Sequence, residues 1–373
     1  MSVAELIEVT RRYGGNPDYV LAGGGNTSLK KDGVMYVKAS GTTMGEIDES
    51  GFVKMDQKAL DALWTVEYPE DKDEREERAL EDLMKARLEG ETSRPSVETL
   101  LHCFIPFKFV VHTHPALVNG MTCSKGGQGW AEKELGDRVL WIPVVNPGYI
   151  LAKYVKDRVD ERLASGQGFP DFIMLQNHGV FTGGNSIEEV DLKYQYLMGK
   201  LEESIRITPN MAEEPVDLAV AAVLKKAVQK AYGPEAGFEF KNIRQCKEWL
   251  QSKEAASPVF SALTPDHIVY MGHKPLWIPE GGEAELEQSL VEGVSAYEGE
   301  FGKKPKTILV QNRGILSCGV NAKEAFLSGI LFRDAVKVAV LSENFGGVQF
   351  MPQDKIDFIN TWEVEKYRAK KSI

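Results

Sequence analysis

The chain has 373 residues, a hydrophobic fraction of 43% and a formal net charge of −11 at pH 7. That length accommodates two domains of ordinary size, and the acidic balance argues against nucleic acid as a partner. No apolar run reaches the length of about 20 residues that spans a membrane, and the four cysteines form no Cys-x-x-Cys pair, so we expect a cytoplasmic protein with reduced thiols. The chain begins with an amphipathic helix of mixed charge, Ser2 to Tyr13, which does not resemble a signal peptide.

A glycine-rich turn follows at Leu21 to Ser28, and after it come a strand-like stretch, Gly33 to Lys38, and the polar run Ala39 to Thr43. Glycines let backbone N–H groups converge on an anion, and Asn, Ser and Thr add neutral donors. The spacings of a dinucleotide fingerprint and of a Walker loop are both missing. The turn is therefore either an anion-binding loop or an ordinary hairpin.

A charged stretch, Glu67 to Glu91, predicts an exposed helix with ion pairs along its surface. The next helix is predicted to begin around Pro95, because proline suits a first turn and Ser93 or Ser96 could cap it. Glu98 would then lie in the first turn, where a helix N-terminus favours negative charge. His102 follows one turn later on the same side, and we expect it to pack behind the site instead of acting as a ligand.

Three of the six histidines lie in two short strings, His112-Thr113-His114 and Asn177-His178-Gly179. The apolar residues Phe109 to Val111 predict a buried strand, and on a strand the side chains of His112 and His114 share a face. A third histidine on a second strand completes a set of three nitrogens that can hold a catalytic metal with one position open. Ordinary strand histidines are the alternative interpretation.

A segment near the middle of the chain is repeated in the second half. Ile173 to Thr182 aligns with Ile308 to Ser317 at a constant offset of 135 residues, and a fainter match pairs Asp32 to Tyr36 with Asp266 to Tyr270. The second copy has Arg313 in place of His178 and contains no His-x-His, which predicts a degenerate domain without a metal site. We expect Arg313 to form a structural salt bridge, with anion binding as the alternative.

The order of these pieces resembles the class II (metal-dependent) aldolase and adducin family from about residue 20 to residue 200. The shared order is Gly-Gly-Asn-Thr-Ser, Ser-Gly, Pro-Ser-Val-Glu, His-Thr-His-Pro and Asn-His-Gly. The resemblance implies an α/β protein: a three-layer α/β/α class II aldolase/adducin-like catalytic domain at residues 1–210. A degenerate second aldolase-like α/β domain without a metal site would follow at residues 211–373.

The resemblance also implies roles for individual residues. His112, His114 and His178 would bind a divalent ion, zinc or alternatively manganese, and Glu98 would ligate the resting ion and then act as the acid/base. The residues implied at the phosphate end of the substrate are Asn26, Thr27, Ser40, Gly41 and Ser96. Two positions depart from the family pattern: Val97 stands where small aldolases often have a second serine, and Gly23 where some members have threonine. Arg94 could compensate for the missing donors.

The downstream sequence is most similar to the aldolase part of rhamnulose-1-phosphate aldolase/alcohol dehydrogenase fusion proteins, because Thr361 to Tyr367 resembles the end of that part. No dehydrogenase glycine fingerprint occurs, so a dehydrogenase half would be absent or lie on a separate chain. The resemblance implies a homo-oligomeric aldolase that cleaves a ketose 1-phosphate, such as rhamnulose 1-phosphate, to dihydroxyacetone phosphate and an aldehyde, lactaldehyde for a deoxy sugar. The alternatives are a sugar-phosphate 4-epimerase, dehydratase or decarboxylase on the same fold, and a non-enzymatic adducin-like binding protein.

Overall fold

The computed structural model describes residues 2–364 and Tyr367. The chain divides into two compact units. The first holds Gly126–Ser204, the chain before Cys123 and the segment that begins at Trp362, and the second holds Cys123–Lys125 and Ile205–Thr361. Among the described residues, no helix combines the length and apolarity needed to cross a membrane. The four cysteines are buried and unbridged.

The first unit is built on a seven-stranded sheet with the strand order β3-β2-β1-β4-β7-β6-β5. Its strands are β1 (Asn26–Lys31), β2 (Val34–Lys38), β3 (Phe52–Asp56), β4 (Phe109–Thr113), β5 (Val139–Ile142), β6 (Phe172–Leu175) and β7 (Gly179–Gly184). Its helices are α1 (Val3–Gly14), α2 (Gln57–Ala62), α3 (Lys72–Lys85), α4 (Thr99–Phe104), α5 (Ala116–Thr122), α6 (Gly127–Leu135), α7 (Tyr149–Ala164) and α8 (Ile187–Ser204). Neighbouring strands are antiparallel except for the pair β5 and β6, which is parallel.

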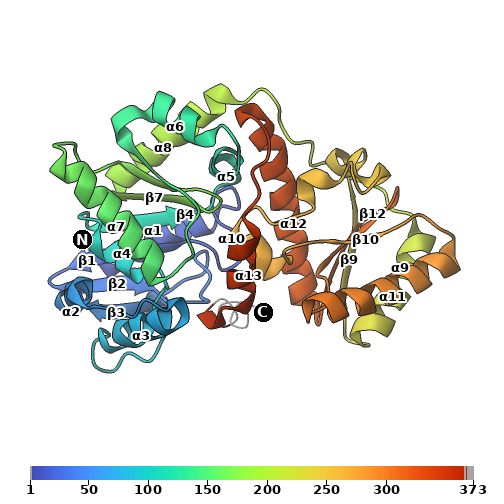
Figure 1. Cartoon of the computed structure of the whole chain (residues 1–373), viewed down its shortest axis with the longest axis horizontal. Coiled ribbons are helices and arrows are strands. Elements are labelled where there is room, and N and C mark those ends of the chain that lie inside the picture. Colours follow the sequence, from blue (N-terminus) through green and yellow to red (C-terminus); the bar gives the residue numbers. More distant parts are fainter. Residues whose placement is uncertain (1, 365–366, 368–373) are drawn as a thin grey trace. The chain divides into compact units, whose positions relative to one another are not determined.

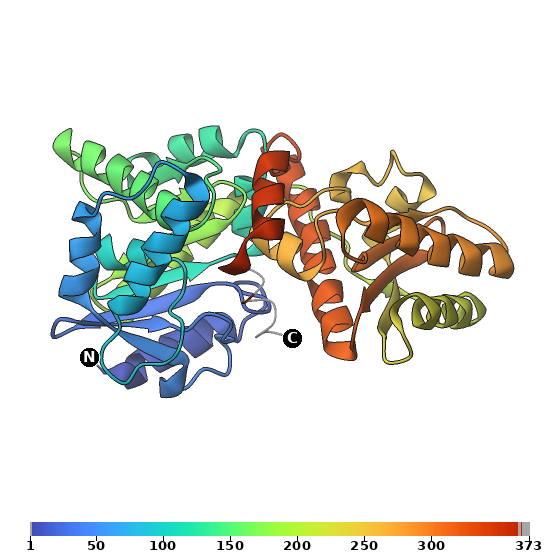
Figure 2. The same cartoon turned by 60° about the horizontal axis from the view of Figure 1, so that its bottom comes forward.

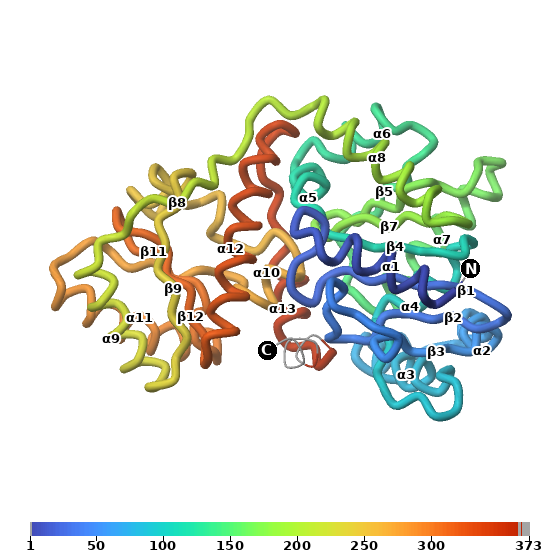
Figure 3. Tube along the Cα trace, turned by 180° about the vertical axis from the view of Figure 1, so that it is seen from behind, coloured from blue at the N-terminus to red at the C-terminus, as the bar shows by residue number. Residues whose placement is uncertain are grey.

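Helices cover both faces of this sheet, which gives the predicted three layers (Figure 1). Apolar side chains of α2, α3, α4 and α7 form a core with one face, and among them are Leu60, Leu83, Leu100 and Val155. Helices α1 and α8 pack on the other face, which Figure 3 shows from behind. The predicted first helix is present and begins after Ser2, whose hydroxyl accepts a hydrogen bond from the N–H of Glu5 in a capping box.

The second unit has a five-stranded sheet with the order β10-β11-β12-β9-β8. Its strands are β8 (Glu213–Glu214), β9 (Gly237–Ile243), β10 (Leu276–Ile278), β11 (Thr307–Val310) and β12 (Gly314–Gly319), and its helices are α9 (Leu218–Tyr232), α10 (Pro265–Tyr270), α11 (Glu283–Phe301), α12 (Ala322–Ser342) and α13 (Gln353–Thr361). Helices α9 and α11 share an apolar core with one face of the sheet, and α12 packs against β12 and β9 (Figure 2).

The internal repeat appears as two hairpins of equal length and equal register. Phe172 pairs with Thr182 in the first hairpin, and Thr307 pairs with Ser317 in the second. Both turns contain an asparagine in the left-handed region, with φ of 58° at Asn177 and 56° at Asn312. In the first sheet β4 pairs with β7, and in the second sheet β9 pairs with β12 in the corresponding position. The second sheet therefore repeats the central part of the first.

The fainter part of the repeat is wrong. Asp32 to Tyr36 forms a turn and most of strand β2, whereas Asp266 to Tyr270 lies in helix α10. Thr264 caps α10 by accepting a hydrogen bond from the N–H of His267, and Pro265 occupies the first turn. This local helix-start signal outweighs the residue similarity on which the match was based.

Replacing Asn312 with valine is expected to lower the free energy of unfolding by about 1–2 kcal/mol, because a β-branched residue is strained at positive φ. Replacing it with glycine is the matched control. Both variants lose the hydrogen bond from Asn312 Nδ2 to Glu280, but glycine accepts the backbone conformation. Urea denaturation measures both, and equal stability of the two variants would contradict a conformational role.

Candidate active site

The predicted strand before the first two histidines is present as β4, whose five residues are all buried. His112 lies on this strand, and His114 follows one residue after its end, so their side chains point to the same side. His178 was expected on a second strand, but it lies in the turn between β6 and β7, directly before Gly179. A Cβ on Gly179 would lie 2.4 Å from the carbonyl oxygen of Thr113, so only glycine lets the turn approach the end of β4 so closely.

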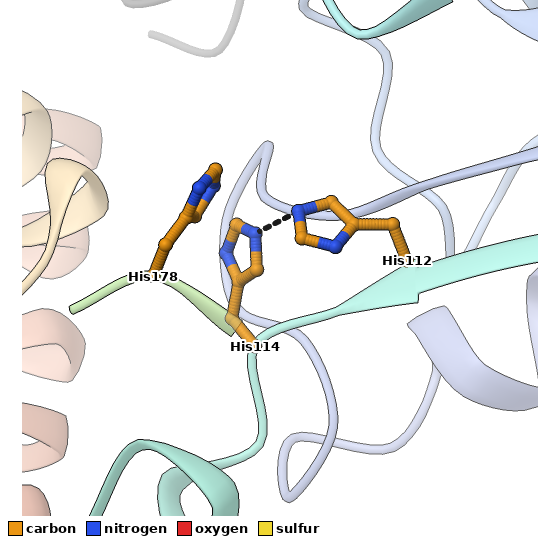
Figure 4. Close-up of side chains that lie close together, drawn as sticks. All are labelled: His112, His114 and His178. Carbon is orange, nitrogen blue, oxygen red and sulfur yellow. Dashed lines mark hydrogen bonds between the residues drawn. The ribbon is translucent and has the colours of Figure 1, made fainter. Parts of the chain in front are cut away.

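The three imidazole rings converge (Figure 4). Their candidate ligand nitrogens all lie within 4.8 Å of one another, and Nε2 of His112 is 2.9 Å from Nε2 of His114. In the part of the chain that the structure describes, this is the one group of three or more histidine, cysteine or acidic residues arranged in this way. Two nitrogen lone pairs that face each other repel unless a proton or a cation lies between them, so the arrangement suits a metal ion.

The orientation of His112 also suits metal binding. Its ring is fully buried and stacks on Phe181, with 3.9 Å between the ring centroids. Its Nδ1 lies 3.0 Å from the carbonyl oxygen of Val180. Because a carbonyl oxygen only accepts, Nδ1 carries the proton, and Nε2 keeps a lone pair directed at the other two histidines.

Glu98 faces the same cluster. Its Oε1 lies 3.5 Å from Nε2 of His112 and 3.7 Å from Nε2 of His178. This oxygen is buried without a hydrogen-bond partner among the described residues, whereas Oε2 accepts a hydrogen bond of 2.6 Å from Nδ2 of Asn26. A buried carboxylate oxygen without a hydrogen bond, beside two imidazole nitrogens of the cluster, is a costly arrangement in the absence of a cation. The donor set of three nitrogens and one carboxylate oxygen therefore fits a divalent metal ion.

The position of Glu98 differs from the predicted one. Helix α4 begins at Thr99, so Glu98 is the residue before the helix and does not lie in its first turn. Pro95 does not start the helix either, because it forms an isolated antiparallel bridge with Ala39. Ser96 accepts a hydrogen bond from the N–H of Glu98, which holds the backbone at the carboxylate.

A polar network behind Glu98 fixes the amide of Asn26. Nε2 of His102 hydrogen-bonds Oδ1 of Asn26, and Nδ1 of His102 lies 2.8 Å from Oγ of Ser28. Burial holds the pKa of His102 well below its ordinary value, so the ring is neutral and donates through one nitrogen only. With its oxygen bound to His102, Asn26 turns its NH₂ group toward Glu98 and Ser96. His102 therefore packs behind the site, as predicted.

The residues predicted at the phosphate end do not all lie together. Asn26 and Ser96 lie beside Glu98, and Ser40 donates its N–H to the carbonyl oxygen of Arg94 in a loop where Gly41 has a φ of 80°. The hydroxyl of Thr27 is fully buried and lies 2.6 Å from the hydroxyl of Thr10 on α1. Strand alternation thus directs the side chain of Thr27 away from that of Asn26.

The corresponding positions of the second unit carry different side chains. Arg313 occupies the turn position of His178 and lies 3.4 Å from Glu280 in an ion pair, as expected for a structural arginine. Phe240 pairs with Leu316 in the position where His112 pairs with Phe181. An aromatic ring and a guanidinium replace two of the imidazoles, so this copy does not offer the nitrogen donors of the first.

The model of one protein family, described as Class II Aldolase and Adducin N-terminal domain, matches residues 4–207. The chain belongs to the class II aldolase and adducin family. This match contains Glu98 and all three histidines of the cluster. Class II aldolases use divalent metals, and the three-histidine cluster could bind one.

Other proteins are similar to this family member along different parts of its length. It is 25% identical over 408 residues to the "Uncharacterized oxidoreductase YuxG" of Bacillus subtilis (strain 168). The match covers 98% of this chain and 58% of that protein, so this chain spans less than two thirds of the length of that relative. The N-terminal class II aldolase domain of a conserved Thermoplasma acidophilum protein is 31% identical, covering 55% of this chain and 94% of that one with a TM-score of 0.47. L-fuculose-1-phosphate aldolase from Thermus thermophilus is 16% identical. The match covers 54% of this chain and 90% of that one, with a TM-score of 0.34.

Proposed function

We propose that this protein is a metal-dependent aldolase that cleaves a ketose 1-phosphate, such as rhamnulose 1-phosphate, to dihydroxyacetone phosphate and an aldehyde. The observation that carries the proposal is the placement of Glu98. One of its oxygens is held by Asn26, and the other has no hydrogen-bond partner among the described residues and lies beside the imidazoles of His112 and His178. Membership of the class II aldolase and adducin family supports the same reaction type.

In this proposal His112, His114 and His178 hold the divalent ion, with zinc as the first expectation and manganese as the second. A bound ion would supply Lewis-acid stabilisation of the negative charge that develops on oxygen when the carbon–carbon bond breaks. The carboxylate of Glu98 is the proton-transfer group. Asn26 orients this carboxylate, because its NH₂ group donates to Oε2 and leaves Oε1 directed into the cluster.

The atoms of the proposed cleavage balance without a further reactant. A base takes the proton of the C4 hydroxyl, the C3–C4 bond breaks, and its electron pair moves toward the C2 carbonyl to give an enediolate. The aldehyde leaves, and a proton returned to C3 gives dihydroxyacetone phosphate. The substrate phosphate would lie against the residues predicted for it, which are Asn26, Thr27, Ser40, Gly41 and Ser96. Thr27 could contribute its backbone there, since its hydroxyl is bound to Thr10.

The experiment is metal analysis of the purified protein together with a screen of ketose 1-phosphates. Release of dihydroxyacetone phosphate is measured with a coupled enzyme assay, and the aldehyde is identified by mass spectrometry. We expect triose phosphate from at least one phosphorylated ketose and none from the same ketose without phosphate. A product of unchanged mass would indicate epimerisation, and loss of water or carbon dioxide would indicate dehydration or decarboxylation. Any of these results would overturn the aldolase proposal.

Three broader proposals accompany this function. Residues 1–210 are proposed as the catalytic domain and residues 211–373 as the degenerate domain, which the equal hairpin registers support. Within the second range, the copy itself would end at Thr361, because the segment that begins at Trp362 belongs to the first compact unit. The protein acts in the cytoplasm as a homo-oligomer. A separate dehydrogenase chain uses one of its products, a proposal consistent with the similarity to a protein described as an oxidoreductase. Light scattering on the purified chain tests the oligomer, with a monomer as the contradicting result.

A further inference from the structure

The segment that leads to Glu98 runs beside the end of strand β2. Ala39 and Pro95 form an antiparallel bridge, flanked by hydrogen bonds from the N–H of Ser40 to the carbonyl oxygen of Arg94 and from the N–H of Ser96 to that of Lys38. Ser40 therefore lies opposite Arg94, and Lys38 lies opposite Ser96. Because side chains alternate along extended segments, these four side chains share one face of the bridge.

That face is the one directed at the candidate active site. Ala39, on the opposite face of the bridge, belongs to the apolar core of the first unit. Ser96, on the shared face, has its hydroxyl 3.1 Å from Nδ2 of Asn26, the amide that also binds Glu98. Ser96 thus brings one hydroxyl of this face to the amide that binds Glu98, and Ser40 and the basic residues Lys38 and Arg94 lie on the same face of the bridge. Lys38 is only 3% exposed, so its charge lies in surroundings where water screens it weakly.

The guanidinium of Arg94 has an ion-pair partner, but one of its nitrogens makes no hydrogen bond within the described part of the chain. Its side chain is 12% exposed, and Nη1 lies 3.1 Å from Oε2 of Glu363. The guanidinium carbon lies 5.1 Å from the centre of the Tyr367 ring. Nη2 is buried and has no hydrogen-bond partner within the described part of the chain. A buried guanidinium N–H without an acceptor is costly, so this nitrogen is available for an acceptor from outside those residues.

Glu363, which forms the ion pair with Arg94, lies between two residues that line a cavity of the first unit. Trp362 and Val364, the two neighbours of Glu363, line a small cavity together with Val97, and Val364 is 5% exposed. Val97 lies between Ser96 and Glu98 in the chain. The residues on both sides of Glu363 thus line the same cavity as the segment that carries the site. They keep the backbone of Glu363 near Arg94, and its carboxylate, with a side chain that is 72% exposed, reaches one edge of the guanidinium.

We propose that Arg94 is the cation that binds the phosphate group of the substrate and makes the protein select phosphorylated ketoses. Glu363 holds one nitrogen of its planar fork, and Nη2 with the hydroxyls of Ser40 and Ser96 receives the phosphate oxygens. A guanidinium suits this role because its donors match phosphate oxygens two at a time. It would compensate for the serine that the family pattern has at Val97. The inference deepens the proposed function, since it names the residue that selects the phosphate.

The test measures binding of inorganic phosphate by calorimetry to the purified protein with its metal. The variant Arg94→Gln is expected to raise the dissociation constant by about tenfold to a hundredfold, the scale of losing a hydrogen bond to a charged group. Arg94→Lys should give an intermediate value, because it keeps the charge but loses the fork. The surface substitution Arg158→Gln, which removes the same charge from an exposed ion pair, is the control and should leave binding unchanged.

Glu363→Gln separates phosphate binding from a purely structural role. If Arg94 binds phosphate, Glu363→Gln should bind it at least as tightly as the parent protein, because a competing carboxylate is removed. If Arg94 only fastens the segment around Glu363, neither Arg94→Gln nor Glu363→Gln would change phosphate affinity, and the inference would fall. The same measurement in His112→Ala/His114→Ala tests whether phosphate binds the metal instead. If phosphate binding were lost in His112→Ala/His114→Ala but unchanged in Arg94→Gln, the inference would also be overturned. All of these experiments measure phosphate binding and none requires aldolase turnover. The role of Arg94 is therefore tested separately from the proposed reaction.

Discussion

Replacing His112 and His114 together with alanine is expected to remove bound divalent metal and to abolish cleavage of the sugar phosphate. The two rings supply two of the three converging nitrogens, and Nε2 of one lies 2.9 Å from Nε2 of the other. One histidine and one carboxylate would remain, too few donors to retain an ion during purification. Since loss of an outer partner alone weakens metal binding by about tenfold to a hundredfold, loss of two ligands should weaken it further.

Metal content per chain is measured by plasma mass spectrometry, and activity by triose phosphate release. His273→Gln is the control, because His273 is a buried histidine of the second unit and packs on Tyr297 and Phe301. It should keep the metal. The single variant His178→Ala should resemble the double variant if all three nitrogens bind the same ion. Full metal occupancy in His112→Ala/His114→Ala would refute the ligand assignment.

Local sequence patterns predicted the parts of the site that depend on one element. Alternation along a strand placed His112 and His114 on one side, and β4 is present where the apolar residues indicated it. The alignment at a constant offset of 135 residues also corresponds to two hairpins with the same backbone geometry, because equal turn residues lie at equal spacing in both. Periodicity is a property of a single segment, so it can be read from that segment alone.

The parts that depend on pairing between distant segments could not be predicted in this way. The start of α4 was expected near Pro95, but Pro95 pairs with Ala39, more than fifty residues earlier in the chain, and remains extended. Nothing in the sequence around Pro95 specifies that partner. The contact of Asn26 with Glu98 depends on the same pairing, because it brings Ser96 and Glu98 to the beginning of β1.

The side chains of Asn26 and Thr27 point in different directions, although the family resemblance implies both residues at the phosphate end. The sequence patterns placed both residues in the glycine-rich turn, Leu21 to Ser28. Strand β1 begins at Asn26, so alternation separates the side chains of Asn26 and Ser28 from that of Thr27. The run of glycines obscured where the strand begins, and the turn was extended through residues that already alternate.

Replacing Glu98 with glutamine is expected to reduce turnover by about a hundredfold or more while the protein keeps much of its metal. Glutamine has nearly the same shape and preserves an oxygen that can accept the hydrogen bond from Asn26, now made by Oε2 of Glu98. It cannot accept a proton, and loss of a positioned acid/base group costs about 10²–10⁴ in rate. The three imidazole nitrogens remain to hold the ion.

The comparison with Asn26→Ala shows whether Glu98 acts as a proton carrier or only as a ligand. Asn26→Ala leaves the carboxylate in place but frees Oε2, so turnover should fall less than in Glu98→Gln. If Glu98 serves only to ligate the metal, Glu98→Gln should lose metal and activity in parallel, and added metal should restore both. If it transfers the proton, excess metal restores occupancy without restoring turnover. Near-normal turnover in the metal-loaded Glu98→Gln variant would contradict the assignment, because no chemistry would then depend on a carboxylate at this position.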